Sequence, residues 1–181
     1  AEHLAGLAAK AGDREGASGH LRGLLQQRPW QSNALLRLHD LETGMDERLE
    51  KLPGSLAVLC YSYNKGAELK ETLEAAAGSD FSFAQGDVRF VVLDNGSSDE
   101  TSAVLSGMSE QLGERLEIVT LPVNVGAPAA RNWLLRHPVV AASDFCAYLD
   151  DDATVEPDWI GRFGAGVAAY PDAGVWGARI L

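Results

Sequence analysis

The sequence predicts an α/β fold, a mostly parallel, doubly wound sheet preceded by a small α-helical segment. From Ser55 onward, short apolar runs typical of strands alternate with stretches that have the apolar periodicity of helices. Residues 1–50 instead carry apolar positions at helical spacing only, and Pro53-Gly54 forms a natural break between the two patterns. We therefore expect a helical segment over residues 1–52 and an α/β domain over residues 53–181.

Three helices are expected in the N-terminal segment. A break at Gly12-Asp13 separates the first two, Pro29 stops the second, and Ser32 or Asn33 caps the third, which ends at Gly44. Their apolar faces consist of Leu4, Leu7, Ala8 and Ala11, of Ala17, Leu21, Leu24 and Leu25, and of Leu35, Leu36, Leu38 and Leu41. The first two helices resemble a tetratricopeptide repeat in the spacing of Ala8, Gly12, Ala17, Leu21, Leu24 and Pro29. Because one repeat cannot bury its own face, we expect the tail of a longer array or a helical cap on the next domain.

Five strands are expected in the second segment. Residues 56–61 form a continuous apolar run, as in a strand covered on both faces, and residues 145–149 are interpreted as another buried strand. The expected strands are 56–61, 88–93, 116–121, 144–149 and 173–178. The expected helices run from Leu69 to Gly78, from a cap at Asp99 through Met108, from Ala129 to Leu135, and from Pro157 to about Ala169.

Composition limits the classes of function. The formal net charge of −11 argues against a nucleic-acid-binding surface, which needs a basic stripe, and gives no polybasic membrane anchor. No apolar run approaches the roughly 20 residues that span a bilayer, and the first residues show no secretory pattern. Cys60 and Cys146 each lie in an apolar run, where buried reduced thiols are favoured over a disulfide. We therefore expect a cytoplasmic protein.

Polar segments follow four of the expected strands. Each segment alone is ordinary turn chemistry, but ligands of parallel sheets bind beyond the carboxyl ends of the strands, so four together favour a shared site. The segments are Tyr61-Ser62-Tyr63-Asn64-Lys65-Gly66, Asp94-Asn95-Gly96-Ser97-Ser98-Asp99, Asn124-Val125-Gly126-Ala127-Pro128 leading to Arg131-Asn132, and Asp150-Asp151-Asp152. The sequence has no Gly-x-Gly-x-x-Gly after the first strand and no Gly-Lys-Ser/Thr loop, which disfavours dinucleotide-binding and P-loop folds.

The three consecutive aspartates permit two interpretations. Unpaired charge is expensive to bury, so Asp150, Asp151 and Asp152 are expected at an exposed strand end. There they suit a hard divalent cation, Mn²⁺ or Mg²⁺, with substrate phosphates completing the coordination shell. The alternative is a solvated acidic turn that opens the next helix.

Taken in order and spacing, the four segments resemble the nucleotide-sugar half of a family 2 glycosyltransferase with the GT-A fold. The resemblance runs from about residue 55 to 180 and includes Glu100-Thr101 and Pro157 beside the segments quoted above. It implies transfer of a sugar, with inversion, from a nucleoside diphosphate to an acceptor hydroxyl on a glycan, lipid or protein. It also implies a divalent metal, Mn²⁺ or Mg²⁺, that stabilises the diphosphate leaving group.

The resemblance further implies roles for single residues. Tyr61 and Tyr63 would flank the nucleobase, next to Asn64, while Asp94 and Asn95 would meet the base or ribose. Many family members have a second Asp where Asn95 stands, so the base stays open between uridine, which is favoured, and thymidine. Asp150 and Asp152 match the family's DxD motif: Asp152 would bind the metal, Asp150 or Asp151 would bind ribose or metal-bound water, and Arg131 and Lys65 would contact the diphosphate or sugar.

A general base is not identified. The family usually takes it from a carboxylate well after the DxD strand, and none of the later carboxylates here, Glu156, Asp158 and Asp172, is expected to serve. We therefore expect a C-terminally truncated piece that binds the donor and transfers sugar poorly. One rival is a non-catalytic module whose N-terminal helices dock a protein. A nucleotidyltransferase is disfavoured because no Gly-rich loop of its usual kind lies near the first strand. Separately, an exposed sheet edge would favour a homodimer.

Overall fold

The computed structural model of the protein describes residues 1–177, and the chain divides after Arg48 into two compact units. The first unit consists of the three expected helices, α1 (Glu2–Lys10), α2 (Arg14–Gln27) and α3 (Ser32–Thr43). Gly12, at a φ of +78°, allows the turn between α1 and α2, and the Asp13 carboxylate accepts the Gly16 N–H to start α2. Gly44 ends α3 in the left-handed conformation, as predicted.

Small and branched side chains form the core of this unit. Ala5, Leu21 and Ala34 are fully buried against one another. Four leucines of the expected apolar faces are instead more than half exposed, namely Leu4, Leu7, Leu35 and Leu36. Three short helices bury only the residues on their mutual contacts, so much of their apolar surface stays open. The likeness to a tetratricopeptide repeat stays a prediction.

The predicted cap of α3 is wrong. Gln31 occupies the capping position and makes no side-chain capping bond, because the helix begins at Ser32. Ser32 and Asn33 therefore already lie within the first turn, where their side chains no longer precede the free N–H groups that a cap satisfies.

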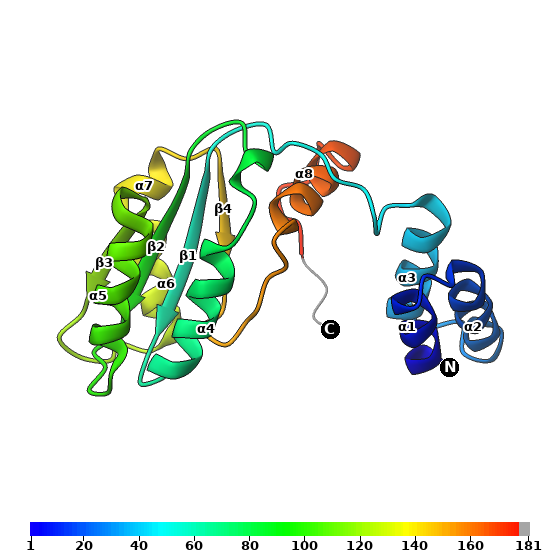
Figure 1. The fold of residues 1–181 in the computed structure, drawn as a ribbon, viewed down its shortest axis with the longest axis horizontal. Coiled ribbons are helices and arrows are strands. Elements are labelled where there is room, and N and C mark those ends of the chain that lie inside the picture. The colour runs from blue at the N-terminus through cyan, green and yellow to red at the C-terminus, as the bar shows by residue number, and fades with distance from the viewer. Residues whose placement is uncertain (178–181) are drawn as a thin grey trace. The chain divides into compact units, whose positions relative to one another are not determined.

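The second unit is a four-stranded, all-parallel sheet with helices on both faces (Figure 1). Its strands are β1 (Leu56–Ser62), β2 (Val88–Asp94), β3 (Leu116–Thr120) and β4 (Phe145–Tyr148), in the spatial order β3-β2-β1-β4. Its helices are α4 (Gly66–Ala77), α5 (Thr101–Leu112), α6 (Ala127–Leu135), α7 (Pro138–Ala141) and α8 (Trp159–Ala169), with 3₁₀ turns at Phe81–Phe83 and Gly113–Arg115. The expected α/β fold with an N-terminal helical segment is confirmed. The short helix α7 was not predicted.

Each face of the sheet has its own core, because successive side chains of a strand point to opposite faces. One core joins Val58 of β1 and Phe90 of β2 to helices α4, α5 and α8, whose buried contributions are Leu69, Leu73, Leu105, Met108, Ile160 and Val167. The other joins Leu59 and Leu93 to α6 through Ala130 and Leu134. The central strands β1 and β2 are therefore covered on both faces, as predicted for residues 56–61.

The predicted burial of residues 145–149 is wrong. Within the described chain, β4 pairs with β1 alone, so it lies at the edge of the sheet and its residues alternate between half-buried and exposed. Cys146 is accordingly exposed, against prediction, while Cys60 is buried as expected. Both cysteines are free thiols, in agreement with the expectation of no disulfide.

The predicted fifth strand does not form within the described residues. Residues 173–177 are irregular, and Ala178 lies outside the part of the chain that the structure describes. An apolar residue of this run serves side-chain packing: the Trp176 ring lies edge-on to the rings of Phe145 and Phe163, with centroid distances of 6.3 and 5.9 Å. Among residues 1–177, no helix combines the length and the hydropathy required of a transmembrane segment.

Helix α8 is held against the segment before β1 at a glycine. A Cβ at Gly164 would collide with the Glu50 carbonyl oxygen and lie 2.8 Å from the Leu52 nitrogen. We expect Gly164→Ala to lower the free energy of unfolding by about 1–3 kcal/mol, the usual cost of overpacking, in a denaturant titration.

Gly166→Ala is the matched control on the same helix, because its Cβ would meet only Trp176, at an ordinary 3.6 Å. It should be neutral or gain up to about 1 kcal/mol from helix propensity. Equal effects of the two substitutions would contradict the close contact at Gly164.

Candidate functional site

We call the region beyond the carboxyl ends of β1 and β4, where the strand order reverses, the crevice. Strands β1, β2 and β3 follow one another in one direction across the sheet, and the chain then returns to the other side of β1 to form β4. In open parallel sheets, ligands bind at such a reversal, beyond the carboxyl ends of the two strands. Residues 61–66 leave β1 at this point and residues 150–152 follow β4. Two of the four predicted segments therefore border the crevice.

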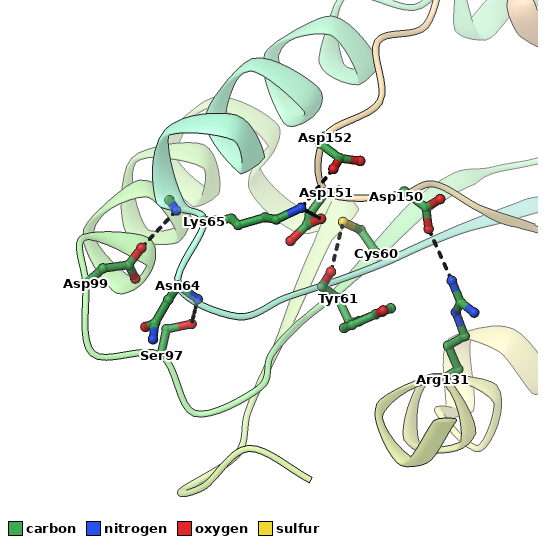
Figure 2. A network of polar contacts seen from close by, with 11 residues as sticks. Cys60, Tyr61, Asn64, Lys65, Ser97, Asp99, Arg131, Asp150, Asp151 and Asp152 are labelled. Atoms are coloured by element: carbon green, nitrogen blue, oxygen red, sulfur yellow. Dashed lines mark hydrogen bonds and ion pairs between the residues drawn. The ribbon is translucent and has the colours of Figure 1, made fainter. Parts of the chain in front are cut away.

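Lys65 bridges these two segments (Figure 2). Its Nζ lies 2.8 Å from Oδ2 of Asp152 and 3.4 Å from Oδ1 of Asp151. The hydrogen bond to Asp152, followed by the charge of Asp151, raises the pKa of Lys65 far above its usual range. The same hydrogen bond lowers the pKa of Asp152. Three of the predicted site residues thus meet in one charged group.

Arg131 holds the remaining aspartate from the other side. One guanidinium nitrogen lies 3.2 Å from Oδ1 of Asp150, and the guanidinium carbon lies 5.5 Å from the ring centre of Tyr61 and 5.9 Å from that of Tyr148. The Tyr148 hydroxyl donates to the Arg131 carbonyl oxygen at 3.2 Å. The carboxylates are therefore shared between two cations, one on each side of the crevice.

Cys60 lies in β1 beneath the aspartates. Burial, and next the negative charges of Asp151, Asp150 and Asp152, raise the pKa of its thiol well above the ordinary range. The thiol therefore stays neutral and adds no further charge beneath the carboxylates.

Asn64 joins the turns that follow β1 and β2. Its backbone has a φ of +51°, and its N–H donates to Oγ of Ser97 at 3.0 Å while its Oδ1 accepts the Ser98 N–H at 2.8 Å. The left-handed conformation suits Asn, which tolerates it better than most residues. The neighbouring Tyr63 is 43% exposed, so its ring is available to a ligand.

Asp94 and Asn95 are almost fully buried, at 3% and 1% exposure. Asp94 accepts the Ser97 N–H at 2.9 Å. The Asn95 amide accepts the Val125 N–H at 3.0 Å and donates to Oδ1 of Asn124 at 3.1 Å. The oxygen and the nitrogen of the Asn95 side chain are thus both hydrogen-bonded within the protein. Asn95 therefore holds the turn after β3 beside the turn after β2.

Asp99 fixes the starts of two helices. Its carboxylate accepts the Thr101 hydroxyl and N–H at the start of α5, at 2.6 and 3.1 Å, and the Gly66 N–H at the start of α4, at 3.0 Å. The Thr101 hydroxyl is the main reason that the pKa of Asp99 is lowered. The capping position of α5 is Glu100, one residue after the predicted Asp99, but the Asp99 carboxylate does bind the first N–H of the helix. Its second role at α4 was not foreseen.

Sequence reasoning missed Tyr148 and the linking role of Asn124. Tyr148 shares a face with Cys146 in β4 and precedes Asp150 by two residues, a spacing that could have indicated a side chain beside the site. Asn124 also accepts the Gly126 N–H at 2.7 Å, a local bond typical of Asn in turns.

The aspartates have the donor chemistry for a hard divalent cation. Carboxylate oxygens are preferred ligands of such ions, and Asp150 and Asp152 have 64% and 58% of their side-chain surface exposed. Within residues 1–177, no three His, Cys, Asp or Glu side chains converge as a metal-binding group. The chain thus offers one or two carboxylates, which fits a cation whose shell is completed by phosphates and water.

Two hollows, of about 410 and 400 Å³, lie at the amino ends of the strands, opposite to the predicted residues. Both include Asp87 and Arg89, at the amino end of β2, and Arg89 is paired with Glu117 at 2.7 Å. Ligands of open parallel sheets bind at the carboxyl edge, where the predicted residues gather, so we place the site there.

The comparisons with known proteins identify the family. The model of the family described as glycosyl transferase family 2 matches residues 58–181, more than half of the chain. The chain belongs to glycosyl transferase family 2. A search of the curated proteins finds no match to it.

Two solved proteins share the fold. A mannosyltransferase from Pyrobaculum calidifontis, in complex with GDP-Man and Mn²⁺, aligns with a TM-score of 0.57 and 20% identity, covering 92% of this chain and 44% of its own. Residues 1–349 of S. aureus TarS align with a TM-score of 0.54 and 23% identity, covering 65% and 33%. The same fragment in complex with UDP aligns with a TM-score of 0.52. This chain therefore spans less than half the length of each structure, and the likeness concerns the fold.

The linkage of the turns by Asn95 leads to a stability prediction. Asn95→Ala leaves the Val125 N–H without its acceptor and Asn124 without its donor. We expect the free energy of unfolding to fall by about 1–3 kcal/mol, the net contribution of two hydrogen bonds at about 0.5–1.5 kcal/mol each, in a denaturant titration.

Asn95→Asp tests the direction of the amide. It keeps the acceptor for Val125 but sets a carboxylate against Oδ1 of Asn124, so it should also be destabilising. Wild-type stability of both variants would contradict the hydrogen bonding described for this turn.

Proposed function

We propose that this chain forms the donor-binding part of an inverting glycosyltransferase that uses a nucleoside-diphosphate sugar and a divalent cation. The observation that carries the proposal is the placement of Lys65 and Arg131 against Asp150–Asp152 at the crevice between β1 and β4. Membership of glycosyl transferase family 2 supports the reaction class. The reaction would pass the sugar to an acceptor hydroxyl.

The aromatic and amide side chains of the crevice would receive the nucleoside. Tyr63 offers an exposed ring, and Tyr61, two residues earlier in β1, lies beneath the Arg131 guanidinium. Asn64 holds the turn that carries Tyr63. Asp94 and Asn95 form the floor of the base or ribose site, shaping the turns from a buried position.

The charged side chains would receive the diphosphate. Asp152 and Asp150 would hold Mn²⁺ or Mg²⁺, with Asp151 directed at the ribose or at metal-bound water. When bound, the cation neutralises the negative charge that develops on the leaving diphosphate. Lys65 and Arg131 provide two further positive charges at the same place, and Arg131 offers the planar, bidentate geometry that suits phosphate.

The nucleobase is expected to be uracil, with thymine as the alternative. The TarS fragment was solved with UDP and the mannosyltransferase with GDP-Man, so uridine and guanosine nucleotides both belong in the test. Asn95 carries no charge with which to select a base, unlike the Asp that the family often has at this position.

Thermal stability in the presence of nucleotides tests the proposal. With Mn²⁺ and UDP, dTDP, GDP or ADP added separately, we expect UDP or dTDP to raise the Tm, and only when the metal is present. A ligand at 100 times its Kd adds about 2.7 kcal/mol to the stability of the folded state. Asp152→Ala should abolish the shift.

Asp172→Ala is the matched control, because it removes one exposed carboxylate from the turn after α8, outside the crevice. It should keep the full shift. A nucleotide-induced shift that Asp152→Ala leaves intact would contradict the proposed site and favour a non-catalytic nucleotide-binding module.

A further inference from the structure

We propose that Lys65 is an exchangeable counter-ion: it pairs with Asp151 and Asp152 before the donor binds and passes to the donor's diphosphate when a divalent cation takes the carboxylates. The inference rests on the proposed function and adds to it the order in which charges are exchanged at the site. It assigns Lys65 a positioning role in donor binding.

The need for a counter-ion follows from the local charge. Asp150, Asp151 and Asp152 are consecutive, and Asp151 is the least exposed of them, with 15% of its side-chain surface open. Carboxylates packed this closely repel one another unless cations lie between them. Lys65 supplies that charge to Asp151 and Asp152 together, and Arg131 supplies it to Asp150.

The ammonium group of Lys65 and a divalent cation compete for the same carboxylates. Lys65 Nζ approaches Oδ2 of Asp152 at 2.8 Å, which is full hydrogen-bonding contact. A doubly charged ion on that carboxylate would repel the ammonium group at short range. Binding of the cation to Asp152 therefore weakens the contact with Lys65, and the position of Lys65 lowers the affinity of the carboxylates for metal.

The side chain of Lys65 is free to change its position, whereas that of Arg131 is held by aromatic rings. The Lys65 ammonium sits on a flexible four-carbon stem that is 42% exposed, directly before α4. Arg131 lies over the rings of Tyr61 and Tyr148, and Tyr148 also bonds to its backbone. A freed ammonium group beside a metal-bound diphosphate can pair with the phosphate oxygens instead.

Binding of Mn²⁺ alone, measured by titration of its paramagnetic resonance signal, tests the first half of the exchange. Lys65→Met keeps the apolar stem and removes the charge. We expect it to bind Mn²⁺ roughly tenfold more tightly than wild type at low salt, with a smaller gain at high salt. Lys70→Met is the control, because Lys70 lies further along α4 and faces Glu74 at 3.8 Å. It should leave the affinity unchanged.

Binding of UDP and of GDP at saturating Mn²⁺ tests the second half. Here Lys65→Met should bind more weakly than wild type, because the freed ammonium group is no longer present to contact the diphosphate. The variant thus gains affinity for metal and loses affinity for nucleotide, a pair of opposite changes that loss of structure would not produce.

The possible outcomes distinguish failure of the charge exchange from failure of the proposed donor-binding function. Mn²⁺ binding that Asp152→Asn abolishes but that is equal in wild type and Lys65→Met overturns the exchange and leaves the donor site intact. Weaker nucleotide binding without a gain in Mn²⁺ affinity also overturns it. Absence of Mn²⁺ binding in both wild type and Lys65→Met overturns the exchange, and absence of Mn²⁺-dependent nucleotide binding as well overturns the proposed function.

Discussion

The structure of this site depends on neutralising three adjacent carboxylates at the end of an edge strand. Strand β4 brings Asp150–Asp152 to the carboxyl edge of the sheet, where they would repel one another without nearby cations. Lys65 and Arg131 reach them from the two elements that border the crevice, the turn after β1 and helix α6. When a metal and a diphosphate are bound, positive charge must balance both the carboxylates and the phosphates. The described geometry thus sets two positive side chains against three carboxylates, which leaves one negative charge in excess at the site.

The cations are positioned by polar contacts between turns. Asn64 links the turn after β1 to that after β2, Asn95 links the turn after β2 to that after β3, and Asp99 fixes the starts of α4 and α5. These bonds satisfy N–H groups in the turns and at the starts of helices α4 and α5, where no partner within the same element is available. Lys65 follows Asn64 directly, so the rigidity of the turns determines where its side chain begins.

Much of this arrangement could be predicted from the sequence. Alternation of apolar runs with helical periodicity gave the α/β fold, and the polar strand ends indicated the residues now found around the crevice. Strand order could not be predicted, because it depends on which helix crosses which face of the sheet. It is this order that makes β4 an edge strand, exposes Cys146 and sets Lys65 opposite Asp152. The burial of Asn95 was also missed, since its partners Val125 and Asn124 lie 30 and 29 residues further along the chain.

The central claim is that a divalent cation and a nucleoside diphosphate bind together at the carboxyl edge of the sheet. The most direct measurement is the broadening of backbone amide resonances of ¹⁵N-labelled protein by substoichiometric Mn²⁺ in the presence of UDP. The account predicts that residues 61–66 and 150–153 broaden first, because they surround the bound ion. Broadening centred on residues 87–89 and 114–117, at the amino edge, or spread evenly over the chain, would contradict it.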